Sequence, residues 1–266
     1  MSKFISKMLL LTLLSMRVFA AQDLGAVYSR IEELTKKVVD PKDRALLTAR
    51  LVYRIMDSEM WDRARDLAYT IEEPITQSKM LQYIAITYAM TFQKDKAIEV
   101  AQKMPLANYG IPVYLKIAKL FHMMGLEEDV DSLLLKAETE SKALGIPAWE
   151  SGYLAQTAFA YAYCGKLEHA LEIATQLSVP SDRVEALASL SAFFENHDRG
   201  VEASEIMQIA MEIAKKEWEL GKQADLLLKI AEGYENVSKK PEDSQETHKN
   251  FKRKIYSELY ETDSSD

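Results

Sequence analysis

Apolar residues recur along this chain at the three-and-four spacing of α-helices, and the helices themselves recur with a longer period. A small residue returns at intervals of 33, 33, 40, 33 and 40 residues. These positions are Val52, Ala85, Ala118, Ala158, Ser191 and Ala231. A period of this length is typical of stacked supersecondary units, each of which buries its apolar face against its neighbours.

Each small residue is accompanied by larger residues at constant offsets. Three positions later stand Ile55, Tyr88, Phe121, Tyr161, Phe194 and Tyr234. Twelve positions after each of the first five small residues stand Ala64, Ala97, Val130, Ala170 and Ala203. Small residues let two helices approach closely, and the large residue fills the space one turn further on. The pattern therefore predicts paired helices, and no long stretch has the period of two that indicates strands.

Glycines and prolines divide these helices. Gly125 and Gly165 lie midway between paired helices, where glycine commonly ends a helix and turns the chain. Prolines are expected to end the second helices, because proline cannot continue a helix: Pro74, Pro105 and Pro180. The two intervals of 40 residues predict lengthened second helices over 132–145 and 204–221.

These residues resemble the tetratricopeptide repeat. An aromatic residue or Leu, then Leu, a small residue and Tyr follow at that family's spacing, and the second helix has Ala-x-x-x-apolar. The match covers about residues 44–237. The resemblance implies an all-α fold, a right-handed αα-hairpin solenoid of about five and a half repeats with helical caps at both ends.

The sequence departs from the family pattern in ways that make it a divergent example. The leading Trp is replaced by Thr, Leu or Tyr, and the large aromatic of the second helix is replaced by Ala. The prolines come early, and two intervals are stretched. Another αα-hairpin repeat is therefore the alternative interpretation.

Residues 1–20 have the pattern of a secretory signal peptide. Lys3 and Lys7 precede an apolar run over 8–16, and Val18-Phe19-Ala20 suits cleavage before Ala21. This predicts an exported protein, periplasmic or secreted, with no integral membrane segment after cleavage. The alternative is an uncleaved anchor, although the run is shorter than the ~20 residues that span a bilayer.

The repeat domain is expected over 21–237, and both of its ends are expected to be capped. Its first helix has one apolar stripe, which we expect to cover the first repeat: Leu24, Val27, Ile31, Leu34 and Val38. Residues 238–266 are expected to form a polar linker, an amphipathic helix marked by Phe251, Ile255 and Leu259, and a disordered tail.

Composition and charge limit the classes of partner. With 48% apolar and 28% charged residues, the chain has enough apolar side chains for a core. The formal charge of −8 disfavours nucleic acid and anionic membrane surfaces as partners. Cys164 is the only cysteine, and its place before Gly165 at a helix end favours a buried structural thiol.

The search for catalytic chemistry favours a protein that is not an enzyme. The histidines are scattered through different units without the spacing of a zinc helix motif, and His122-Met123-Met124 is better explained as core filling than as a soft-metal site. No phosphate-binding loop, nucleophile elbow or dinucleotide fingerprint is present in the sequence. We therefore expect neither metal nor other cofactor.

The resemblance also locates a binding groove, because the first helices of tetratricopeptide-like stacks line the concave side. At the matching offsets the chain offers mainly apolar and aromatic residues, namely Tyr53, Met56, Gln82, Ile86, Leu115, Lys119, His122, Phe159 and Tyr163. The alternative is that these side chains pack between neighbouring hairpins. The basic and Asn residues with which some family members hold a peptide's terminal carboxylate are missing at these offsets.

Three functions are compatible with these sequence features. The leading hypothesis is an exported, non-enzymatic scaffold whose groove binds a peptide segment or partner helix of another protein. The second is a structural subunit that self-associates through its end helices into a homo-oligomer. The third is an enzyme of the α/α-toroid kind, which would need paired acids facing one cavity.

Overall fold

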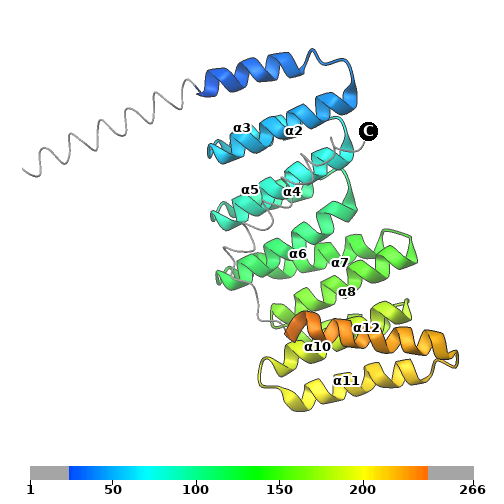
Figure 1. Ribbon diagram of the computed structural model, residues 1–266. Helices are drawn as coiled ribbons and strands as arrows, with labels where there is room; N and C mark the ends of the chain where they lie inside the picture. The colour runs from blue at the N-terminus through cyan, green and yellow to red at the C-terminus, as the bar shows by residue number, and fades with distance from the viewer. Residues whose placement is uncertain (1–23, 239–266) are drawn as a thin grey trace, which may run out of the picture. The chain divides into compact units, whose positions relative to one another are not determined.

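The computed structural model describes residues 24–238, and every regular element in that range is helical (Figure 1). The all-α prediction is therefore confirmed for the described residues. After a helix over residues 24–35, the N-terminal helix, come α2 (Pro41–Asp57), α3 (Trp61–Ala68), α4 (Pro74–Met90), α5 (Lys94–Gln102), α6 (Ala107–Met123), the 3₁₀ turn η1 (Glu127–Asp129), α7 (Val130–Lys142), α8 (Pro147–Tyr163), α9 (Leu167–Gln176), α10 (Pro180–Glu195), α11 (Gly200–Lys215) and α12 (Leu220–Ser238).

The described residues fall into two compact units, 24–81 and 82–238, with the boundary inside α4. None of the described helices combines the length and the apolar character needed to cross a bilayer. The predicted signal peptide and the predicted helix at Phe251, Ile255 and Leu259 lie outside the described residues.

The left-handed turn that ends each first helix repeats with the period of the sequence. After α6 and α8 the left-handed residue is glycine, with φ of 73° at Gly125 and 76° at Gly165, as predicted. Glu59, Phe92 and Asp198 adopt the same conformation in the other turns, with φ of 59°, 60° and 58°. The turn therefore forms even where a side chain must accept a left-handed backbone, a conformation that disfavours residues other than glycine.

One backbone hydrogen bond closes each of these turns in the same way. The N–H that follows the left-handed residue donates to the carbonyl of the large apolar residue of the repeat, as in the Schellman motif. The pairs are Met60 to Ile55, Gln93 to Tyr88, Leu126 to Phe121, Lys166 to Tyr161 and Arg199 to Phe194, with N···O distances from 2.8 to 3.2 Å. The structure thus contains repeated helical hairpins: α2–α3, α4–α5, α6–α7, α8–α9 and α10–α11.

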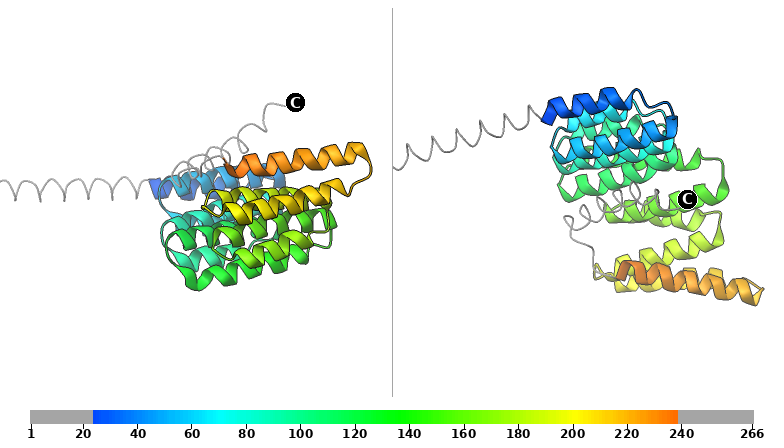
Figure 2. Two further views of the ribbon diagram at one scale, coloured as in Figure 1. Left: turned by 90° about the horizontal axis from the view of Figure 1, so that it is seen from below. Right: turned by 45° about the horizontal axis from the view of Figure 1, so that its top comes forward.

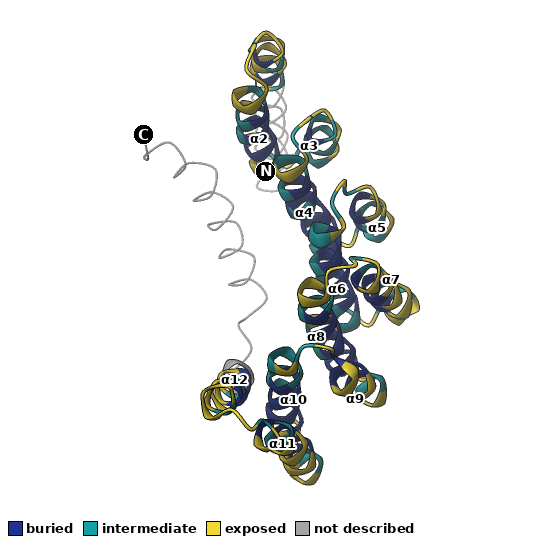
Figure 3. Ribbon diagram, turned by 90° about the vertical axis from the view of Figure 1, so that its right-hand side faces the viewer, coloured by how far each residue is buried: buried dark blue, intermediate teal, exposed yellow. Residues whose placement is uncertain are grey.

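The buried positions agree with the predicted register through α11. The first five small residues are buried, as are the second set and the large residues from Ile55 to Phe194. In Figure 3, dark-blue buried residues lie where α6, α8 and α10 meet their neighbours, and yellow exposed residues lie on the outer sides of α7, α9 and α11. In the second unit α6 packs on α7, α8 on α9 and α10 on α11, and α7 also packs on α8. The register fails only in α12, where Ala231 is exposed.

The expectations for helix lengths and ends are met in part. The lengthened second helices are confirmed, because α7 has 13 residues and α11 has 16, against 8 in α3, 9 in α5 and 10 in α9. The prediction that prolines end the second helices was wrong in detail.

Pro74 and Pro180 are the first residues of α4 and α10, and Pro105 precedes α6. At the start of a helix the missing N–H of proline costs nothing, because that N–H has no intrahelical partner.

The N-terminal helix packs through a different face from the one predicted. Tyr28 is buried, and its hydroxyl donates to the Arg54 carbonyl at 3.2 Å and lies 2.8 Å from the Ser58 hydroxyl oxygen. Arg63 also binds the Glu32 carboxylate at 2.7 Å. These polar contacts select the inner face, so the predicted apolar stripe is exposed at Leu24, Val27, Ile31 and Leu34.

Candidate functional site

The structure divides the nine predicted groove residues into two groups. Four are buried and contribute to the core: Tyr53 and Met56 in the first unit, and Ile86 and Leu115 in the second. For these four, packing between helices describes the structure better than a groove does. The other five are partly exposed, and all lie in the second unit: Gln82, Lys119, His122, Phe159 and Tyr163. Ring and cation contacts join the last four of them.

Lys119 lies at the centre of this group, between aromatic rings of the next hairpin. Its Nζ is 5.4 Å from the ring centroid of Phe159 and 5.9 Å from that of Tyr163. Lys119 is on α6 and the two aromatic residues are on α8, one turn apart, so both rings are on the same side of α8. A cation at these distances is attracted by the negative faces of the rings.

Phe193 of α10 and His197 in the turn after it extend the group, and the sequence patterns above did not identify either. The ring centroid of Phe193 lies 5.6 Å from that of Phe159 and 6.4 Å from that of Tyr163. His197 follows one turn later, with its ring 4.1 Å from that of Phe193. Its Nδ1 donates to the Phe193 carbonyl at 2.7 Å, so a neutral His197 has Nε2 as an acceptor. The four-residue spacing of Phe193 and His197 was a signal available in the sequence.

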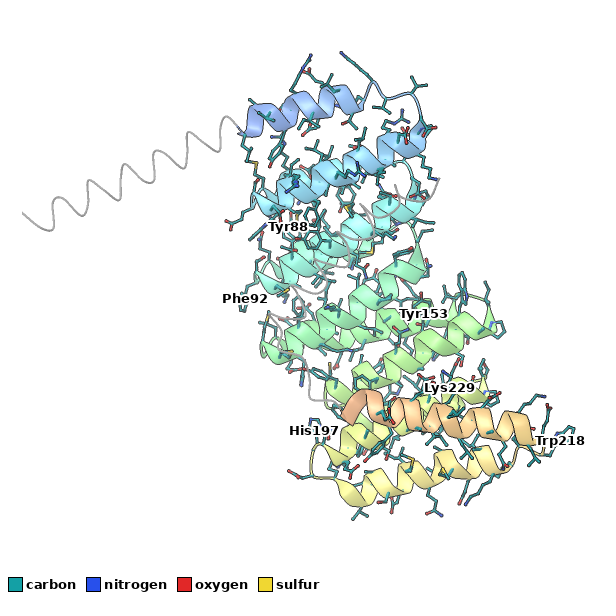
Figure 4. All side chains as sticks on the ribbon, in the orientation of Figure 1. Tyr88, Phe92, Tyr153, His197, Trp218 and Lys229 are labelled. Atoms are coloured by element: carbon teal, nitrogen blue, oxygen red, sulfur yellow. The ribbon has the colours of Figure 1, made fainter. Side chains whose placement is uncertain are left out.

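His122 completes the group at the end of α6. Its Nδ1 lies 2.7 Å from the Glu127 carboxylate, and its ring meets the Tyr163 ring edge-on, with centroids 6.2 Å apart. We call the six residues the lysine–aromatic surface: Lys119, His122, Phe159, Tyr163, Phe193 and His197. They come from the C-terminal halves of α6, α8 and α10 and from the turn after α10, so three consecutive hairpins build the surface. Figure 4 labels His197 at this edge, beside the turn into α11.

The charge of Lys119 is not balanced by an acid. Burial lowers the pKa of its ammonium, and the nearby Lys116 lowers it further. Lys119 makes no ion pair with any carboxylate of the residues that the structure describes. The neighbouring Cys164 is buried, and burial raises the pKa of its thiol to about 11, so it is neutral near pH 7 and supplies no counter-charge. This thiol has the buried, structural character predicted for it.

Glu138 of α7 is the centre of a second charged group in the same unit, and this one is satisfied. The Tyr161 hydroxyl donates to its carboxylate at 3.0 Å, Lys142 binds it at 2.6 Å and the His169 Nε2 lies 3.0 Å away. Burial acts to raise the pKa of Glu138, but these three partners outweigh it and hold the pKa below its usual value. Every oxygen of this carboxylate therefore has a partner, which is typical of a structural network.

The described residues contain no group of three His, Cys, Asp or Glu side chains placed to hold a metal ion. The titratable groups of the lysine–aromatic surface also lack the arrangement of a nucleophile hydrogen-bonded to a base. The surface offers ring faces, one ammonium and two imidazoles, which are groups that bind apolar and anionic parts of a ligand.

Comparisons with known proteins add no assignment. No family model matches the chain, and no curated protein matches it. Among solved structures, the crystal structure of Ton1535 from Thermococcus onnurineus NA1 is similar to 80% of this chain and 82% of that chain, at 16% identity and a TM-score of 0.39. A likeness of this size carries no argument about function, so the proposals below rest on the residues themselves.

Proposed function

We propose that this protein is a non-enzymatic scaffold that binds a segment of another protein at the lysine–aromatic surface. The observation that carries the proposal is Lys119, which is partly exposed, lies between aromatic rings and has no acidic partner in the part of the chain that the structure describes. A charged group that is removed from water loses hydration free energy, and this loss is costly unless a counter-charge offsets it. Contact with aromatic rings offsets only part of the loss. A carboxylate from a partner would supply the rest.

The chemistry of the surface defines the kind of segment it would bind. The rings of Phe159, Tyr163 and Phe193 favour a large apolar or aromatic anchor, because such side chains contribute most of the energy in protein interfaces. Lys119 favours an Asp or Glu close to that anchor. The segment would therefore combine an apolar side chain with a neighbouring side-chain carboxylate, which differs from the terminal-carboxylate mode that the sequence disfavours.

Selection from a phage-displayed library of random peptides tests the proposal without knowledge of the natural partner. Peptides selected on the full chain should be enriched in acidic residues next to large apolar ones. Replacing Phe159 with Ala should weaken the binding of such a peptide about 30-fold, corresponding to the ~2 kcal/mol that a buried aromatic anchor contributes. Fluorescence anisotropy of the labelled peptide measures the dissociation constant.

The matched control is Trp149→Ala, because Trp149 is an exposed aromatic residue at the opposite end of the same helix. This variant should bind the selected peptide as the wild type does. If the Phe159 and Trp149 variants bind equally well while both keep the wild-type melting temperature, the lysine–aromatic surface is not the binding site.

Self-association is the second candidate, and the N-terminal helix is the observation that favours it. Leu24, Val27, Ile31 and Leu34 form an exposed apolar face on this helix. Such a face on an end helix is a typical site of contact between copies. Light scattering of the wild type and of Ile31→Glu measures this directly: a dimer that the substitution dissociates supports the second candidate, and a monomeric wild type rejects it.

The proposed localisation follows from residues 1–20, which carry the signal pattern. Mass spectrometry of the protein from its native host should find Ala21 as the first residue. Recovery of intact Met1 from a membrane fraction would support an uncleaved anchor instead.

A further inference from the structure

The last described helix leaves the repeat register, although its sequence continues it. The register predicts that Leu227, Ile230, Ala231 and Tyr234 of α12 form the packed face. In the structure the buried residues of α12 are Leu226, Ile230 and Gly233, and Leu227 and Ala231 are exposed. The helix is therefore turned so that part of its repeat face has no helix packed against it.

A close contact with α10 holds α12 in this orientation. A Cβ added at Gly233 would lie 2.4 Å from the Glu185 carbonyl oxygen, so only glycine permits this approach. The Ser189 hydroxyl donates to the Gly233 carbonyl at 3.1 Å, and Lys229 reaches the Glu185 carboxylate at 3.5 Å. Figure 2 shows α12 lying along α10 in two further views, and Figure 4 labels Lys229 on α12.

The turned helix leaves an open cavity of about 720 Å³ between α10, α11 and α12. Its lining includes Met207, Met211, Leu227, Ala231 and Tyr234, together with polar side chains such as Glu195, Gln208 and Lys215. Three of these five residues belong to the face of α12 that the register predicts to be packed. The cavity thus lies where the missing second helix of a sixth hairpin would contact α12.

Within the described residues, apolar side chains are exposed on the elements that line the cavity. Ile209 of α11 and Leu228 of α12 are exposed, and Trp218, in the loop between these helices, is 86% exposed (Figure 4). Terminal units of helical repeats need a cap with a polar outer face to remain soluble. The exposed residues of α11 and α12 combine these apolar side chains with charged ones such as Glu212 and Glu232, so this face is only partly polar.

We propose that residues 249–259 of the same chain bind in this cavity as the closing second helix. Phe251, Ile255 and Leu259 recur every four residues, which gives a helix one apolar side to place against Met207, Met211 and Leu227. The residues between Ser238 and Phe251 span up to ~40 Å when extended, so they are long enough to return the segment to α12.

Charge is complementary between the segment and the cavity rim. The segment carries one acid, Glu258, and four basic residues, Lys249, Lys252, Arg253 and Lys254. The cavity lining includes Glu195 and one basic residue, Lys215, and Glu232 and Glu235 are exposed on α12, so acidic residues outnumber basic ones here. A tethered segment binds at the high effective concentration set by its linker, so even a weak intrinsic affinity suffices. A second copy of the chain would gain no such advantage at low concentration.

Cysteine cross-linking in the full chain tests this occupant. We pair Met211→Cys with Ile255→Cys and, as the matched control, Leu135→Cys with Ile255→Cys, because Leu135 is exposed on the outer side of α7. The native Cys164 is buried and a poor nucleophile, so it does not compete. After mild oxidation at low protein concentration, the first pair should form an intrachain disulfide in most molecules and the control pair should not.

Methionine oxidation gives a second readout that needs no cysteine. In the wild type, peroxide should oxidise Met211 about tenfold more slowly than in Ile255→Asp, because docking covers it. Ser257→Asp, on the opposite side of the segment, should behave as the wild type does. An interchain disulfide at low concentration would show a second copy as the occupant. Equal oxidation rates, or no cross-link, would show that residues 249–259 do not bind there, and each of these results overturns the proposal.

Discussion

Lys119 and Glu138 are two charged side chains on the paired helices α6 and α7 of one hairpin, and their surroundings differ in opposite ways. Glu138 is 8% exposed and has three partners that balance or bind its charge. Lys119 is partly exposed and contacts two ring faces, but no acid of residues 24–238 pairs with it. The first charge is paired within the described residues, and the second is not.

This difference separates structural from functional polar groups. Groups that stabilise a fold are satisfied within it, because each unsatisfied buried charge costs free energy of unfolding. A charged group that stays unbalanced in the isolated chain is therefore a candidate for binding another molecule. We therefore expect Glu138 to stabilise the fold and Lys119 not to do so.

The largest effect is expected at Glu138. Replacing it with Ala should lower the free energy of unfolding by about 3 kcal/mol, because it leaves Tyr161, His169 and Lys142 without their shared acceptor. Urea unfolding followed by circular dichroism measures this loss. A loss of free energy of unfolding below about 0.5 kcal/mol is typical of ordinary surface residues. That result would contradict a structural role for Glu138 and its difference from Lys119.

Tyr161 and Tyr163, two residues apart on α8, allow a matched comparison. Tyr161→Phe should cost about 1 kcal/mol, because it removes the hydrogen bond to Glu138. Tyr163→Phe should leave the free energy of unfolding unchanged, because no hydrogen bond within the described residues uses its hydroxyl. Urea unfolding measures both variants. Equal losses of free energy of unfolding would contradict the claim that Tyr161, but not Tyr163, belongs to a structural network.

The pH dependence of stability should report the Glu138–His169 pair. The hydrogen bond to Glu138 raises the pKa of His169, so its contribution is complete below the unfolded value of ~6.5 and is lost as pH rises through the folded pKa. The lowered pKa of Glu138 adds a contribution that is lost at acid pH. His169 is 41% exposed, so solvent screening limits the alkaline loss to about 0.5 kcal/mol.

This loss is measured as the difference in the free energy of unfolding between pH 5.5 and pH 8.5. His169→Gln should reduce the difference, because glutamine keeps a hydrogen-bond donor but does not titrate. If the variant and the wild type lose the same stability between the two pH values, the dependence arises from other groups.

The smallest effect on stability, and one of opposite sign, is expected at Lys119. Lys119→Met removes a desolvated ammonium and keeps a flexible apolar side chain against the rings. We expect the free energy of unfolding to stay the same or to rise by up to about 0.5 kcal/mol. A clear loss in urea unfolding would mean that Lys119 has a structural role like that of Glu138.

Local sequence patterns predicted the repeat because close helix packing requires small residues at fixed positions. Ala85, Ala118 and Ala158 are all fully buried, as their spacing indicated. The turns were found only where glycine marked them, because Phe92 and Asp198 adopt the left-handed conformation without a residue type that signals it. The hydrogen bonds of the surrounding helices impose that conformation.

The candidate site was only partly predictable for a similar reason. Lys119 and Phe159 were found from the register, but no sequence pattern reports that a lysine lacks an acid in space. The orientation of α12 was missed because it depends on one glycine, Gly233, which lets two helices approach more closely than the register assumes. Both features depend on contacts between distant parts of the chain.

The most direct test of the central claim is the coupling between Lys119 and a carboxylate of the selected peptide. Isothermal titration would compare the peptide and its Asp→Asn or Glu→Gln counterpart on the wild type and on Lys119→Met, as a double-mutant cycle. We predict a coupling free energy of about 1 kcal/mol or more, because the amide peptide loses affinity for the wild type and not for the variant. Additive effects, with a coupling near zero, would show that Lys119 does not bind the partner's acid and would contradict the account.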